Sequence, residues 1–80
     1  MANNESVFLV WVFDLKAKVR CKTFVVKTNE CDAAKQAIFD LFGETITDDP
    51  CELSSENTQT KTFIFNECFA ADVIAQGVRV

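Results

Sequence analysis

The fold is decided by the stretch Val7-Phe8-Leu9-Val10-Trp11-Val12-Phe13, the longest apolar run in a chain of 80 residues. The stretch is rich in β-branched and aromatic side chains, and it is apolar at odd and even positions alike. Because successive side chains of a strand point to opposite faces, this composition predicts a strand that lies centrally in a sheet and is covered on both faces.

The start of the chain argues against membrane insertion and against export. The apolar run is far shorter than the roughly 20 residues that a membrane-spanning helix needs. The opening residues Met1-Ala2-Asn3-Asn4-Glu5 carry an acid where a secretory signal would carry basic residues. We therefore expect no membrane span and a cytoplasmic location.

The residues after the central stretch predict a hairpin. A polar segment at residues 14–18 is followed by a second β-rich run at residues 19–27, close enough for an antiparallel pairing. Period two in this second run places Lys18, Arg20 and Lys22 together on one face. We expect that face to be exposed to water.

A helix is predicted next, from about Glu30 to Gly43. Thr28 and Asn29 offer capping side chains, and the carboxylates of the first turn favour the positive end of the helix dipole. Apolar residues at helical spacing form one stripe: Cys31, Ala34, Ile38, Leu41 and Phe42. We expect this stripe to lie across one face of the strand at residues 7–13.

The second half of the chain alternates short apolar runs with turn-forming residues. Short strands are predicted at residues 45–47 and 51–53, and turns at residues 48–50 and 54–57. A longer strand at residues 58–66 is expected to pair beside the first strand. Residues 67–76 are predicted as a closing helix capped by Asn66 and ended by Gly77, after which residues 78–80 either add an edge strand or fray.

These elements make a single α+β domain over residues 1–80, with residues 1–5 a candidate for disorder. The expected architecture is an antiparallel sheet of three to five strands with one main helix, in the order ββα(ββ)β, and a short C-terminal helix packed on it. A domain of this length buries only about 60% of the surface that its unfolded chain exposes, so a partner or a second copy would add to its stability.

The residue inventory argues against catalysis. The chain has no histidine and no tyrosine, so the usual general base and a phenolic acid are missing. Its cysteines, Cys21, Cys31, Cys51 and Cys68, form no C-x-x-C pair and are interpreted as free, mostly buried thiols rather than as a long-range metal site. We expect no catalytic residue, no metal and no cofactor.

An acidic, basic-free segment is the feature that points most directly to a function. The formal net charge is -4, and no basic residue occurs between Lys35 and Lys61. The acids of this segment are Asp40, Glu44, Asp48, Asp49, Glu52 and Glu56. Such a surface attracts cationic partners and can occupy a site meant for nucleic-acid phosphate, which predicts an inhibitor or adaptor that docks on a basic surface of another protein. A solvated loop that only aids solubility is the alternative.

A cationic stretch offers a different function. Lys16, Lys18, Arg20 and Lys22 would contact nucleic acid directly if an exposed aromatic, Trp11 or Phe24, supplied a stacking surface. The alternative is a solvated sheet face. A third hypothesis is a homo-oligomeric structural module, such as a dimer, joined through the exposed edge of a strand such as residues 58–66.

The strand, strand, helix, strand order resembles several small phage-encoded anti-defence proteins, including anti-CRISPR inhibitors. The resemblance is carried by the strand-to-helix passage Phe24-Val25-Val26-Lys27-Thr28-Asn29-Glu30-Cys31-Asp32-Ala33-Ala34-Lys35-Gln36-Ala37. It implies a non-catalytic protein of the host cytoplasm that blocks a nucleic-acid channel of its target with an acidic surface, a role that the acidic segment would suit.

Overall fold

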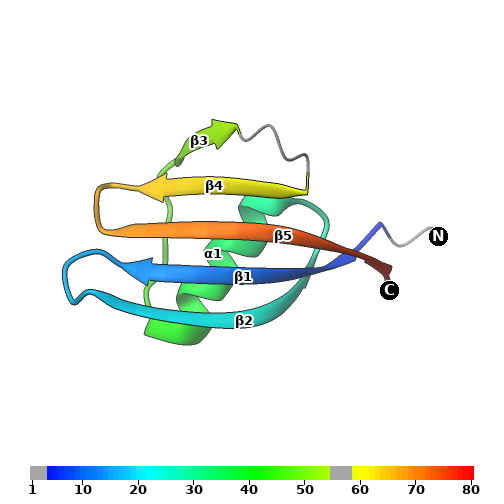
Figure 1. Ribbon diagram of the computed structural model, residues 1–80, viewed down its shortest axis with the longest axis horizontal. Coiled ribbons are helices and arrows are strands. Elements are labelled where there is room, and N and C mark those ends of the chain that lie inside the picture. Colours follow the sequence, from blue (N-terminus) through cyan, green and yellow to red (C-terminus); the bar gives the residue numbers. More distant parts are fainter. Residues whose placement is uncertain (1–3, 55–58) are drawn as a thin grey trace.

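The computed structural model describes residues 4–54 and 59–80, which form one helix and five strands. In chain order the elements are β1 (Ser6–Asp14), β2 (Val19–Lys27), α1 (Glu30–Phe42), β3 (Cys51–Ser54), β4 (Thr60–Phe65) and β5 (Phe69–Arg79). The turn predicted at residues 54–57 lies largely outside the described residues, and of residues 1–5, the candidate for disorder, only residues 4 and 5 are described. Figure 1 shows a single layer of strands with α1 crossing one side of it.

The strands form one sheet in the order β2-β1-β5-β4-β3, and every pairing is antiparallel. The central position predicted for the first strand is confirmed, because β1 lies between β2 and β5 (Figure 1). The prediction that residues 58–66 pair beside it is wrong: β4 lies between β5 and β3. For the same reason β4 is not an edge; the sheet ends at β2 and β3.

The β1–β2 hairpin closes without glycine or proline because an aspartate takes their place. The Asp14 carboxylate accepts hydrogen bonds from the backbone N–H groups of Lys16, at 3.1 Å, and Ala17, at 3.0 Å. Lys18 completes the turn in the left-handed region, with φ of 57°. An aspartate at a turn start commonly stabilises the chain reversal in this way.

The helix agrees with its prediction at both ends. Asn29 is the N-cap, and its side-chain oxygen accepts a hydrogen bond of 2.9 Å from the Asp32 N–H. Gly43 ends the helix with φ of 72°, and its N–H donates to the Phe39 carbonyl at 2.8 Å. Loss of an N-cap of this kind costs about 1 kcal/mol, so these residues fix where the helix starts.

The predicted C-terminal helix is wrong, because residues 69–79 form β5, a strand of 11 residues. Phe69 and Val73, which suggested a helical stripe, are four apart and so share a face in a strand as well as in a helix. The residue that separates the two patterns is Ala71, which is fully buried with them. Residues 78 and 79 continue β5 and add no separate strand.

A tight reversal replaces the predicted helix start. Asn66 and Glu67 both have positive φ, 48° and 59°, and the Cys68 N–H donates to the Phe65 carbonyl at 2.9 Å. Positive φ at both central residues suits the right-handed twist of a β-hairpin. Gly77, expected to end a helix, instead lies in β5 with φ of 73°, where the register between β1 and β5 shifts.

The hydrophobic core fills the space between α1 and one face of the sheet. Phe8, Val10 and Val12 of β1 are 0–5% exposed and point toward the helix side. From α1 the core receives Ala33, Ala34, Ala37 and Ile38, with Cys31, Leu41 and Phe42 packed around them. The predicted stripe is thus confirmed, with two alanines added. Small alanines let the helix lie close to the sheet.

The connection from α1 to β3 does not contain the strand predicted at residues 45–47. In Figure 1 this segment crosses behind the strands near their left-hand ends, from the β2 side of the sheet to the β3 side. Ile46 packs on the core and holds it in place. No helix in the described residues has the length and apolarity that a bilayer crossing requires.

Candidate docking surface

The second face of the sheet has no covering layer among the described residues, which contradicts the expectation that β1 is covered on both faces. Residues directly opposite in an antiparallel pair share a face, so the register gives its rows. Each row starts at β2 and crosses the sheet in strand order. The first row contains Phe24, Leu9, Ile74 and Thr60. The second contains Lys22, Trp11, Asp72, Thr62 and Leu53, and the third contains Arg20, Phe13, Ala70, Ile64 and Cys51. With Val7 and Val26 we call this the open face.

Large apolar side chains on the open face meet solvent. Phe24 is 63% exposed, Leu53 47%, Val26 40% and Phe13 36%. Phe24, Val26 and Phe13 lie on the neighbouring strands β1 and β2, whereas Leu53 lies on β3 at the other edge of the sheet. Contiguous exposed apolar area of this kind usually marks an interaction site in a folded protein.

Cations stack on the aromatic side chains of the open face. The guanidinium carbon of Arg20 lies 4.0 Å from the ring centroid of Trp11 and 5.1 Å from that of Phe13. The Lys22 ammonium lies 5.0 Å from the Trp11 ring centroid. Each such contact contributes about 0.5–1 kcal/mol at an exposed site. These contacts favour positions of the two cations over the aromatic rings of the open face.

The prediction that Lys18, Arg20 and Lys22 share one strand face is confirmed for Arg20 and Lys22 and is wrong for Lys18, which lies in the turn before β2. Arg20 and Lys22 share the open face, and Cys21 between them points to the helix side, as strand alternation predicts. Lys16 and Lys18 lie in the exposed β1–β2 turn, at the same end of β2. The four predicted cations are thus gathered at one corner of the sheet.

Hydrogen bonding also orders the middle of the open face. The Thr62 hydroxyl donates to the Asp72 carboxylate at 2.7 Å, between neighbouring strands. Asp72 pairs directly with Trp11 across β1 and β5. The face therefore presents apolar rows, a cationic corner and one fixed carboxylate near its centre.

The acidic segment lies on the other side of the molecule. Asp40, Glu44, Asp48, Asp49 and Glu52 are all exposed, and Glu56 lies outside the described residues. Asp40 on α1 accepts a hydrogen bond of 2.8 Å from Gln36, whereas Asp48 accepts one from Asn66 in the β4–β5 turn. Glu44 lines a hollow with Lys16 and Phe69. Their neighbours differ, so these acids do not converge on one point.

Two of the acids act on the same thiol. The pKa of Cys31 is raised by burial first, and then by the carboxylates of Asp32, Asp49 and Glu52, while Lys35 lowers it. The two segment acids are therefore near the N-terminal half of α1. All four cysteines are free thiols, and among the described residues no cluster of three or more acids or thiols could hold a metal ion.

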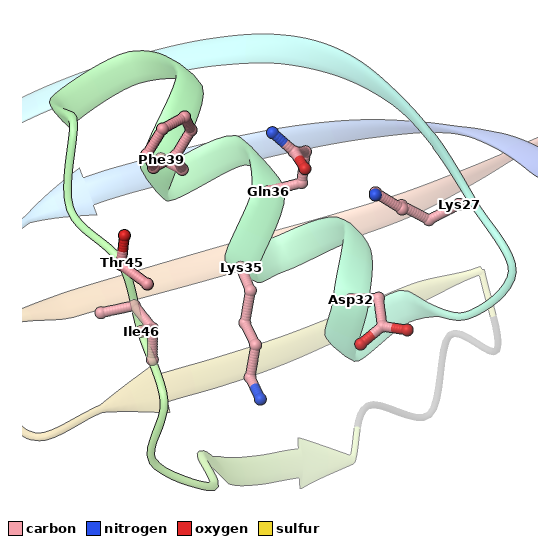
Figure 2. Close-up of a pocket in the computed structure, with 7 residues that line it drawn as sticks. All are labelled: Lys27, Asp32, Lys35, Gln36, Phe39, Thr45 and Ile46. Carbon is pink, nitrogen blue, oxygen red and sulfur yellow. The ribbon is translucent and has the colours of Figure 1, made fainter.

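A shallow hollow of about 390 Å³ lies on the outer side of α1 (Figure 2). Its lining residues are Lys27, Asp32, Lys35, Gln36, Phe39, Thr45 and Ile46. Figure 2 shows Lys35 pointing away from Gln36 and Lys27, so the polar groups do not converge on a common point. The hollow lacks the few convergent polar groups that orient a small-molecule ligand.

The sequence did not predict the apolar residues of the open face as a binding surface. The sequence predicts Phe24 as a stacking partner for nucleic acid and predicts no contact role for Val26 or Leu53. The signal was present in the two-sided apolar pattern of residues 7–13, because one helix covers only one face of a sheet.

Comparison with protein-family models, with curated proteins and with solved structures finds no match to the chain.

Proposed function

We propose that this chain is a non-catalytic protein-binding module, an inhibitor or adaptor, which docks on a partner protein through its open face. The observation that supports the proposal most is Phe24, whose side chain is 63% exposed in an apolar row with Leu9 and Ile74. Leaving such a surface in water forgoes about 25 cal/mol for each Å² that a partner could cover.

The composition and size of the open face suit a protein partner. Trp, Phe and Arg are the residues enriched in protein interfaces and in their energetic centres. Five strands are separated by four spacings of about 4.8 Å, so the sheet is roughly 19 Å across, and the nine residues of β1 extend about 30 Å. That area is of the same order as the about 800 Å² that each partner contributes to a specific interface.

The charges define the partner further. Arg20 and Lys22 at one corner call for carboxylates on the partner, while the exposed apolar residues beside them call for apolar side chains and Asp72 near the centre calls for a hydrogen-bond donor. Because both cations rest on Trp11, little side-chain freedom is lost when a carboxylate binds them. The partner surface we propose is therefore apolar with acidic residues at one side.

A matched pair of variants tests the proposal. Phe24→Ser removes the most exposed aromatic of the open face, and Phe39→Ser removes an aromatic that is 52% exposed on α1. Both are used as tagged bait in nuclease-treated bacterial lysate, and proteins retained by the wild type are identified, purified and titrated. We expect Phe24→Ser to weaken binding of the purified partner by about tenfold or more, equivalent to about 1.4 kcal/mol.

The Phe39→Ser variant is the control, and its affinity should stay within about twofold of the wild type. Unchanged affinity of Phe24→Ser for every purified partner would contradict docking through the open face. Circular dichroism of both variants checks that the fold is retained.

Direct nucleic-acid binding is the second candidate, and a specific observation favours it. Phe24 is exposed on the same face as Arg20 and Lys22. Nucleic-acid binding by these cations required an exposed aromatic that could stack on bases, and Phe24 is such a residue. Labelled single-stranded RNA and DNA should then bind at low salt and be released as salt rises. No change in fluorescence anisotropy at low salt would exclude this function.

The acidic segment stays a separate prediction. An inhibitor of a nucleic-acid-handling protein, as the resemblance to anti-defence proteins implies, would present Asp49 and Glu52 to a basic groove in the host cytoplasm. What supports a shared negative surface there is their common influence on Cys31. Asp49→Lys with Glu52→Lys should then abolish capture of a partner that Phe24→Ser still binds.

A further inference from the structure

The outer edge of β2 has no strand beside it among the described residues. β2 is the first strand of the sheet and pairs only with β1. Among residues 4–54 and 59–80, the backbone hydrogen bonds made outside the strand ladders and the helix involve none of residues 19–27, and the Thr23 hydroxyl donates locally to the Phe24 carbonyl at 3.4 Å. The backbone N–H and C=O groups of β2 that point away from β1 therefore have no described strand to pair with, which makes β2 a template for another strand.

The side chains of β2 on the open face change character along the strand. Arg20 and Lys22 are cationic, whereas Phe24 and Val26 are apolar and exposed. A strand added beside β2 would place its own side chains directly opposite these four. The edge therefore specifies both the composition and the direction of what binds to it.

We propose that β2 accepts an antiparallel strand from the partner protein, in which two apolar residues precede two acidic residues at alternate positions. This inference rests on the proposed function, because the added strand extends the open face. In an antiparallel pair the start of the partner segment lies opposite Val26 and its end lies opposite Arg20. Apolar residues thus meet Val26 and Phe24, and carboxylates meet Lys22 and Arg20.

A second copy of the chain fits this edge less well than an acidic strand. Two copies of β2 would bring the cations of both chains, Arg20 and Lys22 of each, to the same short ladder, and like charges at neighbouring cross-strand positions oppose pairing. Lysine on an edge strand is a common protection against self-association. An acidic strand neutralises the same cations.

Two peptides of identical composition provide the test. The forward probe, Thr-Val-Thr-Phe-Thr-Glu-Thr-Glu-Thr, follows the proposed order, and the reversed probe, Thr-Glu-Thr-Glu-Thr-Phe-Thr-Val-Thr, inverts it. Isothermal titration or anisotropy should give a forward affinity at least about fivefold higher than the reversed one, because only the forward order pairs charges when antiparallel. Equal affinities, tighter binding of the reversed probe or no binding of either probe would overturn the proposal.

Backbone pairing is tested on the peptide, which leaves the protein unchanged. One forward probe carries N-methyl groups on its threonines, and a second carries them on the residues between. In a two-stranded pairing only alternate amides face β2, so one of these probes should lose binding by about tenfold and the other should stay within about twofold. Similar binding of both would exclude strand addition.

Protein variants test the charge pairing. Arg20→Glu with Lys22→Glu should abolish binding of the forward probe and restore binding to a probe whose glutamates are replaced by lysines. Lys16→Glu with Lys18→Glu makes the same change in net charge in the β1–β2 turn and should leave affinity within about threefold. If both double variants lose the same affinity for the forward probe, the loss comes from the change in net charge rather than from specific charge pairs, which would contradict the proposal.

These results separate the two proposals. If both N-methylated probes bind alike while Phe24→Ser still loses the purified partner, strand addition is wrong and docking on the open face stands. If the forward probe binds as expected but Phe24→Ser keeps full affinity for the partner, the proposed function is wrong. Sedimentation that shows a dimer which the forward probe does not dissociate would assign the edge to a second copy and overturn the inference.

Discussion

The two faces of β1 are built from the same kinds of residue and end in different environments. Its even positions, Phe8, Val10 and Val12, are buried against α1, whereas the odd positions line a face that no described element covers. The one helix among the described residues covers only one of the two apolar faces of β1. The difference shows that a two-sided apolar strand can indicate a partner as well as a buried core.

The largest expected contrast compares one phenylalanine from each face. Phe65 is 1% exposed on the helix side and Phe24 is 63% exposed on the open face. Phe65→Ala should lower the free energy of unfolding by about 3–5 kcal/mol, because it leaves a cavity. Phe24→Ala should lower it by less than about 1 kcal/mol. Urea unfolding followed by circular dichroism measures both.

Because a small domain has little stability to lose, a large fraction of the Phe65→Ala molecules will be unfolded in water. That result would agree with the expected large loss of unfolding free energy. Phe65→Leu is the milder variant that keeps the comparison measurable. Equal losses for the two positions would mean that the open face is covered in solution and that the comparison between the faces fails.

The next contrast concerns the cations on the open face. Arg20→Ala with Lys22→Ala removes both groups from Trp11, the single tryptophan of the chain. We expect a loss of about 1 kcal/mol in unfolding free energy and stronger quenching of tryptophan fluorescence by acrylamide. Lys16→Ala with Lys18→Ala is the matched control. Identical quenching in all three proteins would show that the cations do not rest on Trp11.

A smaller contrast compares a thiol from each side. Burial and nearby carboxylates raise the pKa of Cys31, so its thiolate is scarcer at pH 8 than in an ordinary thiol. Cys51 is exposed on the open face. Iodoacetamide should therefore modify Cys51 before Cys31, and the modification of Cys31 should accelerate only at higher pH. Mass spectrometry of proteolytic peptides locates each adduct.

The carboxylates can be tested separately. Asp49→Asn with Glu52→Gln removes charges that raise the pKa of Cys31, so that pKa should fall and modification at pH 8 should become faster. A rate that does not change would place these acids farther from the thiol than the account requires.

The smallest expected effect is on the acidic side. If the open face is the docking surface, Asp49→Lys with Glu52→Lys should change the affinity for the purified partner by less than about twofold. Stability should change by under about 0.5 kcal/mol, because both side chains are exposed. Loss of binding in this variant, with Phe24→Ser unaffected, would reverse the comparison and support the acidic segment instead.

The fold could be predicted where local signals agree. The hairpin and the helix follow from apolar runs bounded by Asp14, Asn29 and Gly43, each of which has a defined backbone role in the structure. The last strand could not, because Phe69 and Val73 fit both periods and Asn66 suits a cap as well as a tight turn. Strand order depends on which apolar faces meet in space. The spacing of apolar residues along the sequence does not determine that order.

The candidate surface could be predicted in part. Alternation placed Arg20 and Lys22 on one face, as the structure confirms. Exposure of Phe24 and Leu53 depends on which face α1 covers, and that choice arises from tertiary packing. The acids of the predicted segment are close in sequence, but the connection between α1 and β3 distributes them along the helix side (Figure 1).

The most direct test of the central claim is side-chain footprinting with hydroxyl radicals, with and without the purified partner. The account predicts that oxidation of Phe24, Trp11 and Leu53 falls on binding, while Phe39, exposed on α1, is oxidised at the same rate. Protection of Phe39 with no change at Phe24 and Trp11 would contradict docking through the open face.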